Sequence, residues 1–109
     1  MSRQLSNPMI EEISSIFSVL GDGSRLKLLL SLLGAEGPVS QGTVAALSGI
    51  SLPNVSKHLA HLVRVGLVRR SPEGTVVYYT AVKPIGSVLL DLVHGHVSEH
   101  AKMTYNALR

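Results

Sequence analysis

The 109-residue chain contains no cysteine and no tryptophan, and it has a single phenylalanine. Without cysteine, the protein has no disulfide bonds, no cysteine-ligated metal site and no thiol catalysis. Apolar residues still make up 45% of the chain, so the core must be built from Leu, Val and Ile. We therefore expect one folded domain with a modest core, rather than a disordered chain or two domains.

Long apolar runs are also missing. No stretch of about 18 apolar residues is present, and residues 1–15 lack the apolar segment of a signal peptide. We therefore expect a cytoplasmic protein with no membrane partner. Residues 1–7 are predicted to form a flexible tail, and residues 8–109 a single domain.

Acidic residues are scarce after Glu36, where only three occur. The chain also has no glycine-rich phosphate loop and no Ser/His/Asp grouping in a pocket-like context, so we predict that it is not an enzyme. Between Gly37 and Lys83 a single acid, Glu73, stands against five basic residues: Lys57, Arg64, Arg69, Arg70 and Lys83. A basic segment suits a polyanion. The charge alone is equally compatible with an ordinary solvated surface.

Helical periodicity accounts for the first third of the chain. Apolar residues recur at helical spacing from Pro8 to Leu20. Asp22 or Ser24 is then placed to cap a second helix. Its predicted core stripe consists of Leu26, Leu29, Leu30 and Leu33.

Two short helices follow, joined by a tight connection. Ser40 is placed to cap the first and Ser51 the second, and Gly49 lies where a positive φ is needed. Two short helices joined by a glycine-containing turn predict a helix-turn-helix.

The rest of the chain predicts a hairpin and a final helix. The strand-forming stretches "LVRR" and "TVVYYTA" flank "SPEG", which suits a type I turn. The helix that begins at Pro84 carries an apolar band broader than one small domain needs, so we expect it to form a dimer surface. This band contains Ile85, Val88, Leu89, Leu92, Val93 and Val97.

The predicted helix over residues 52–65 has two contrasting faces. Val55, Leu59 and Leu62 fall on the core side. The opposite side carries Asn54, Lys57, His58, His61 and Arg64, and no acid. Such a helix fits the major groove of DNA, with Arg69, Arg70 and Thr75 of the hairpin flanking the duplex as a wing. The predicted fold class is mainly α with a small β-hairpin: a winged helix-turn-helix of about five helices that dimerises through its terminal helices.

"LGDGSRLKLLLSL", together with the segment from "VSQGTVAALSG" to "VSKHLAHLVRVGLVRRSPEGTVVYYTA", resembles the ArsR/SmtB family of winged-helix repressors. The resemblance covers about residues 13–105. It implies a homodimer that binds a palindromic double-stranded operator, represses its gene and releases the DNA on binding a ligand. Matching positions to the family also implies which residues contact DNA, on a reading face of the helix and on the wing. The reading face comprises Pro53, Asn54, Ser56, Lys57 and His61, and the wing contacts are Arg69, Arg70 and Thr75.

The metal sites of that family are matched only in part. Its cysteine site falls on a stretch with Ser40 and Thr43 and no thiol, so sensing of soft metals is not expected. Its site on the last helix matches at His96 and Glu99, whereas the first half falls on Lys83 and Ile85, which cannot ligate a metal.

The same helix nevertheless concentrates ligand types within "DLVHGHVSEH". His96 and His100 lie one turn apart, and Asp91 and His94 form a second pair. The predicted metal ligands are Asp91, His94, His96, Glu99 and His100. Imidazole and carboxylate ligands favour nickel, cobalt or zinc. The alternative is that these histidines cover the rim of a dimer interface or titrate near neutral pH.

The favoured function is thus a dimeric repressor that responds to a divalent transition metal. Two alternatives stay open. One is an ArsR-type repressor that senses no metal, and the other is a winged-helix module that binds proteins.

Overall fold

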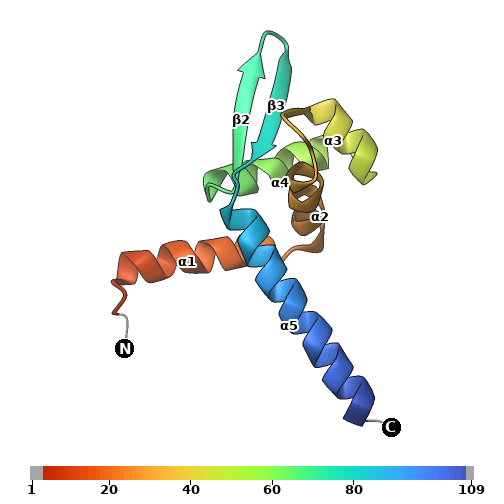
Figure 1. Cartoon of the computed structure of the whole chain (residues 1–109). Helices are drawn as coiled ribbons and strands as arrows, with labels where there is room; N and C mark the ends of the chain where they lie inside the picture. The colour runs from red at the N-terminus through yellow and green to blue at the C-terminus, as the bar shows by residue number, and fades with distance from the viewer. Residues whose placement is uncertain (1–3, 108–109) are drawn as a thin grey trace.

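The computed structural model describes residues 4–107 and confirms the predicted winged helix-turn-helix (Figure 1). The helices are α1 (Asn7–Leu20), α2 (Gly23–Leu33), α3 (Gln41–Ser48), α4 (Leu52–Arg64) and α5 (Ile85–Ala107). The strands are β1 (Val39–Ser40), β2 (Val68–Glu73) and β3 (Val76–Ala81). Helices α2, α3 and α4 form a central body from which the β2–β3 hairpin stands out. Helices α1 and α5 project from that body in different directions (Figure 1).

Side-chain caps begin α1, α2 and α3, and at α1 the Ser6 hydroxyl accepts a hydrogen bond from the N–H of Met9 at 3.3 Å. Asp22 Oδ1 accepts hydrogen bonds from the backbone N–H groups of Ser24 at 2.9 Å and Arg25 at 3.1 Å. The Ser40 hydroxyl accepts from the N–H of Thr43 at 3.2 Å. These bonds satisfy backbone donors that the first turn of a helix leaves unpaired.

Ser51 occupies the N-cap position of α4, but its side chain makes no capping bond, so that prediction is wrong. A capping serine bonds the N–H of the second or third helical residue. Pro53 is the second residue of α4 and has no N–H, which removes one of these two donors. The connection before α4 is as predicted, since Gly49 ends α3 with a φ of 72°.

The sheet differs from the prediction in two respects. Its order is β1-β3-β2, and the short strand β1 was not predicted because two residues carry no alternating pattern. The predicted type I turn over "SPEG" is also wrong. Strands β2 and β3 pair as far as Glu73 and Val76, and Gly74 turns the chain with a φ of 62°. Pro72 is tolerated within β2 because β2 is an edge strand.

The core lies between α2, α3, α4 and the base of the hairpin. Its buried residues are Val19, Leu28, Leu29, Leu32, Val44, Val55, Leu59, Leu62, Leu67, Val68, Tyr79 and Ala81. The predicted stripe on α2 is therefore only partly right, since Leu30 is 51% exposed and Leu28 and Leu32 take part instead. Leucines surround most of α2, so periodicity alone did not identify the buried side.

The two projecting helices differ from this core. Gly86 is the buried residue of α5, and a Cβ atom there would lie 3.3 Å from Leu33 Cδ2. The exposed large apolar side chains of α1 and α5 include Met9, Ile10, Ile13, Phe17, Ile85, Val88, Leu92, Val93, Val97 and Met103. Across residues 4–107, no helix combines the length and the hydropathy that a bilayer span requires.

Candidate nucleic-acid interface

Helix α4 is strongly amphipathic. Val55, Leu59 and Leu62 have 0% exposed surface and fix the helix to the core through one side. Because they recur at helical spacing, the residues between them are turned outward. The inner face predicted from the sequence is confirmed.

The outer side of α4 contains the predicted reading residues. Pro53, Asn54, Ser56, Lys57 and Arg64 are exposed, whereas His58 and His61 are half-buried. At 100° per residue, Pro53, Lys57 and Arg64 lie close to the centre of the outer face. His61, Asn54 and then His58 lie progressively farther from that centre, toward one edge. Lysine, arginine and asparagine are the side chains that commonly contact phosphates and base edges in DNA.

His58 is held by a side chain that the sequence analysis did not assign to the site. Arg25 of α2 donates from Nε to His58 Nδ1 at 3.3 Å. Arg25 is half-buried, and its own backbone N–H is bonded to Asp22. The backbone N–H of Arg25, and to a smaller extent that of Ser24, lowers the pKa of Asp22 by donating a hydrogen bond to its carboxylate. The capping carboxylate is therefore ionised at neutral pH. No sequence pattern indicated this contact, because 33 residues separate its partners.

His61 lies in the same polar cluster. Its Nδ1 is 3.4 Å from a terminal guanidinium nitrogen of Arg64. Burial lowers the pKa of His61, and the positive charges of Arg25 and Arg64 lower it further. The ring is therefore mostly neutral at pH 7, because its ordinary pKa of 6.5 already lies below that pH.

The three residues predicted to contact DNA from the hairpin lie at different places on it. Arg69 and Arg70 are both exposed, opposite Thr80 and Tyr79 of β3 near the base of the hairpin. Successive residues of a strand point to opposite faces, so the two arginines lie on different sides of the hairpin. Thr75 is exposed in the turn at the tip.

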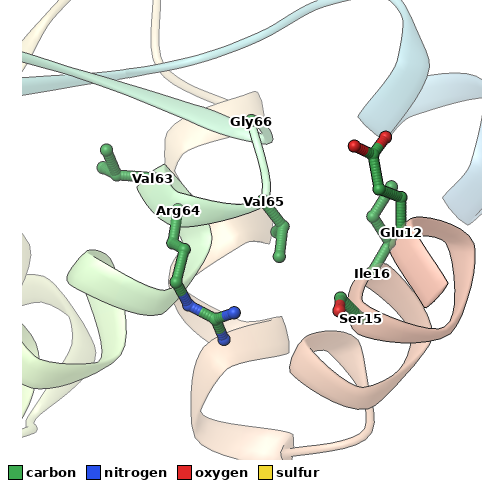
Figure 2. A pocket seen from close by; sticks show the side chains of 7 residues that line it. All are labelled: Glu12, Ser15, Ile16, Val63, Arg64, Val65 and Gly66. Atoms are coloured by element: carbon green, nitrogen blue, oxygen red, sulfur yellow. The ribbon is translucent and has the colours of Figure 1, made fainter. Parts of the chain in front are cut away.

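An open cleft adjoins the end of α4, between that helix and α1. It is lined by Glu12, Ser15, Ile16, Val63, Arg64, Val65 and Gly66. In Figure 2 the Arg64 guanidinium and the Glu12 carboxylate point away from one another. Within residues 4–107 the salt bridge between side chains is Lys102 with Glu99, so Arg64 makes none there. Its charge is thus available at the surface of α4.

The predicted metal ligands all lie on α5 and are exposed: Asp91, His94, His96, Glu99 and His100. The rings of His96 and His100 are stacked, with centroids 6.2 Å apart and 9° between their planes. Glu99 lies 3.9 Å from the ammonium of Lys102. In the part of the chain that the structure describes, no three His, Asp or Glu side chains gather closely enough to hold a metal ion.

The donor set of one copy therefore provides two imidazoles one helical turn apart. Zinc in proteins is usually held by four ligands in a structural site, or by three with one open position. The residues that α5 brings together in one chain fall short of either number. A metal held at His96 and His100 needs further ligands from outside this group.

The chain is similar to transcriptional regulators. A family model described as MarR family matches residues 27–75, from α2 to the turn of the hairpin. The chain is 32% identical over 90 residues to the HTH-type transcriptional regulator KmtR of Mycobacterium tuberculosis, covering 82% of this chain and 66% of KmtR. It is 32% identical over 74 residues to the cadmium resistance transcriptional regulatory protein CadC homolog of Staphylococcus aureus, covering 68% of this chain and 59% of that protein. The chain thus spans less than two thirds of either relative.

A solved structure agrees with this grouping. The homodimeric winged helix-turn-helix DNA-binding domain of Mb0332 from Mycobacterium bovis, described as a possible ArsR-family transcriptional regulator, is 28% identical. Its TM-score is 0.75, over 92% of this chain and 93% of that domain. The matched proteins are regulators and not enzymes, which confirms that part of the prediction. The matching family model is MarR, so the narrower ArsR/SmtB assignment stays a prediction.

Proposed function

Starting from a winged helix-turn-helix chain related to transcriptional regulators, we propose that this protein is a repressor that binds a palindromic DNA operator as a homodimer. The observation that carries the proposal is α4. Its inner face is locked into the core by Val55, Leu59 and Leu62, and its exposed outer face carries Lys57 and Arg64 and no acid.

In this proposal α4 lies in the major groove. Lys57 and Arg64 neutralise phosphates and provide much of the affinity, whereas Asn54 and Ser56 contact base edges or phosphate oxygens. The hairpin flanks the duplex, with Arg69 or Arg70 on the side that faces the DNA and Thr75 at the tip. Two copies are proposed to pair through the apolar surfaces of α1 and α5, which presents two reading helices to two half-sites.

A binding assay tests the proposal directly. The protein is titrated by fluorescence anisotropy onto duplex DNA from upstream of its own gene and onto random duplex, at several salt concentrations. We expect tighter binding to the upstream duplex and a steep loss of affinity with salt. Lys57→Gln should weaken binding to both duplexes about tenfold, whereas Lys102→Gln on α5 should change it less than twofold. Absence of salt-dependent binding to any duplex would favour a protein-binding module instead.

We propose in addition that the regulator responds to a divalent transition metal (nickel, cobalt or zinc) through α5. The stacked His96 and His100 support this proposal, and the missing ligands would come from the second copy or from Asp91, His94 or Glu99 after rearrangement. A metal bound there would favour one geometry of the two copies over another, with a coupling on the order of 1–3 kcal/mol.

The metal proposal has its own test. Calorimetry with nickel, cobalt and zinc is compared for the unmodified protein, for His96→Ala/His100→Ala and for Ser98→Ala/Thr104→Ala on the same helix. We expect loss of binding and of metal-dependent DNA release only in the histidine variant. If no metal binds at micromolar concentration, the repressor responds to another ligand or to none.

A further inference from the structure

The hydrogen bond between Arg25 and His58 determines which nitrogen of the imidazole carries the proton. An arginine side chain stays protonated, so its Nε donates and His58 Nδ1 must accept across the 3.3 Å contact. In the neutral ring the proton is therefore on Nε2. Since Arg25 belongs to α2 and His58 to α4, this bond also fixes the orientation of a side chain on the reading helix.

Donors are left over on both side chains. Within residues 4–107, neither Nε2 of His58 nor the terminal nitrogens of Arg25 make a hydrogen bond to the protein. Both residues are half-buried and so keep part of their surface exposed. Asp22 interacts electrostatically with both Arg25 and His58, and its Oδ1 is already bonded to two backbone N–H groups.

The position of His58 on α4 indicates which part of a DNA duplex it and Arg25 would contact. Lys57 lies near the centre of the outer face, whereas His58 is turned roughly 100° away from it toward α2. The centre of a helix inserted in the major groove faces base edges, and its flanks approach the sugar–phosphate strands. A cation with spare donors on this flank therefore matches a phosphate rather than a base.

We infer that Arg25 and His58 form a binding site for a DNA backbone phosphate on the α2 side of α4. The guanidinium of Arg25 supplies the charge, and His58 donates from Nε2 to a phosphate oxygen. Arg25 also acts as a positioning residue, because its bond to Nδ1 holds His58 in the tautomer that can donate. The inference rests on the DNA-binding function proposed above, and it adds Arg25 to the interface.

A matched pair of charge variants tests the role of Arg25. Arg25→Gln and Lys27→Gln remove the same charge from the same helix two residues apart, and Lys27 is exposed. At about 0.1 M salt we expect Arg25→Gln to weaken DNA binding about tenfold, and to reduce the slope of log K against log salt by about 0.9. Lys27→Gln should stay within twofold of the unmodified protein. Equal effects of the two variants would overturn the inference.

A second pair of variants tests the tautomer. The amide nitrogen of glutamine reaches about as far as Nε2 of histidine, whereas that of asparagine reaches about as far as Nδ1. His58→Gln should therefore bind DNA within about threefold of the unmodified protein, and His58→Asn should bind about tenfold more weakly. Nitrogen-15 NMR of the free protein should show a protonated Nε2 on His58 and, in Arg25→Gln, a mixture of tautomers. A protonated Nδ1 in the unmodified protein would refute the positioning role.

These experiments distinguish a failure of the Arg25–His58 inference from a failure of the proposed DNA-binding function. If the unmodified protein does not bind DNA, the function itself fails. If it binds and Lys57→Gln weakens binding while Arg25→Gln does not, only this inference fails. Thermal unfolding of each variant checks folding. If Arg25→Gln is unfolded, Arg25→Lys, which keeps the charge, should retain the salt slope, and the two His58 variants still decide the outcome.

Discussion

The central body and the two projecting helices use similar apolar residues in opposite ways. In the body, Leu28, Leu59 and Leu62 have no exposed surface, whereas Leu92 on α5 is 69% exposed and Phe17 on α1 is 59% exposed. The body completes its core within one chain, while α1 and α5 leave apolar surface for something else to cover. Substitutions in the body should therefore change folding, and those on the projecting helices should change assembly.

The largest expected effect lies in the body. Leu59→Ala removes a fully buried side chain from the inner face of α4 and should lower the free energy of unfolding by about 2–5 kcal/mol. Chemical denaturation followed by circular dichroism measures this change. A loss below about 1 kcal/mol would mean that α4 is held less firmly than its burial indicates.

A comparable change on α5 should act on assembly instead. Leu92→Glu places a carboxylate within the exposed apolar band and should raise the dimer dissociation constant about 100-fold, equivalent to about 2.7 kcal/mol. Light scattering after size exclusion measures the dimer fraction. Lys102→Glu on the polar part of α5 serves as the control. Identical dissociation constants for Leu92→Glu and the unmodified protein would show that this surface does not pair two copies.

A smaller effect is expected where the body meets the projecting α1. Asp22→Ala removes the cap of α2 and should cost about 1 kcal/mol of stability. Because the cap also fixes the first turn that carries Arg25, the loss should appear in thermal unfolding and in DNA affinity alike. Asp22→Asn keeps a side-chain acceptor and should retain most of the stability.

The smallest expected effect is a dependence of stability on pH. The lowered pKa of His61 means that, below about pH 6.5, the unfolded chain binds a proton more readily than the folded one. The contribution of His61 is fully present above that pH and is lost as the pH falls through the lowered value. Arg25, Arg64 and His58 act in this direction, and Asp22 opposes them. His61→Gln should flatten the decline between pH 6.5 and pH 5 in urea titrations; an unchanged decline would contradict this assignment.

Local patterns predicted much of the fold. Helical spacing identified Val55, Leu59 and Leu62, and the position of Gly49 indicated a positive φ, because both depend on neighbouring residues only. The failures have a physical cause as well. On α2, leucines on most sides left the buried face ambiguous, and at the hairpin the spacing of Pro72 and Gly74 fitted a type I turn that the strand pairing excludes. Strand β1 and the bond between Arg25 and His58 depend on partners far away in the sequence.

The candidate site was predicted less completely than the fold. The outer face of α4 followed from helical geometry, but the half-buried state of His58 and His61 did not, because α2 covers part of that face. The alternation of a strand separates Arg69 from Arg70, although they are adjacent in sequence. The predicted metal ligands share α5 without converging among the described residues, so the proposed metal site needs ligands from a second copy or a rearrangement.

The glycine beneath Leu33 gives α5 a mechanical property. A Cβ at Gly86 would lie 3.3 Å from Leu33 Cδ2, so the helix rests against the body at its first turn with little clearance. From there it runs to Ala107, a length of about 32 Å at about 1.5 Å per residue. A tilt of about 10° about that point displaces the far end by about 5 Å, close to one turn of helix. A side chain larger than glycine at residue 86 would therefore have to displace Leu33 or tilt α5.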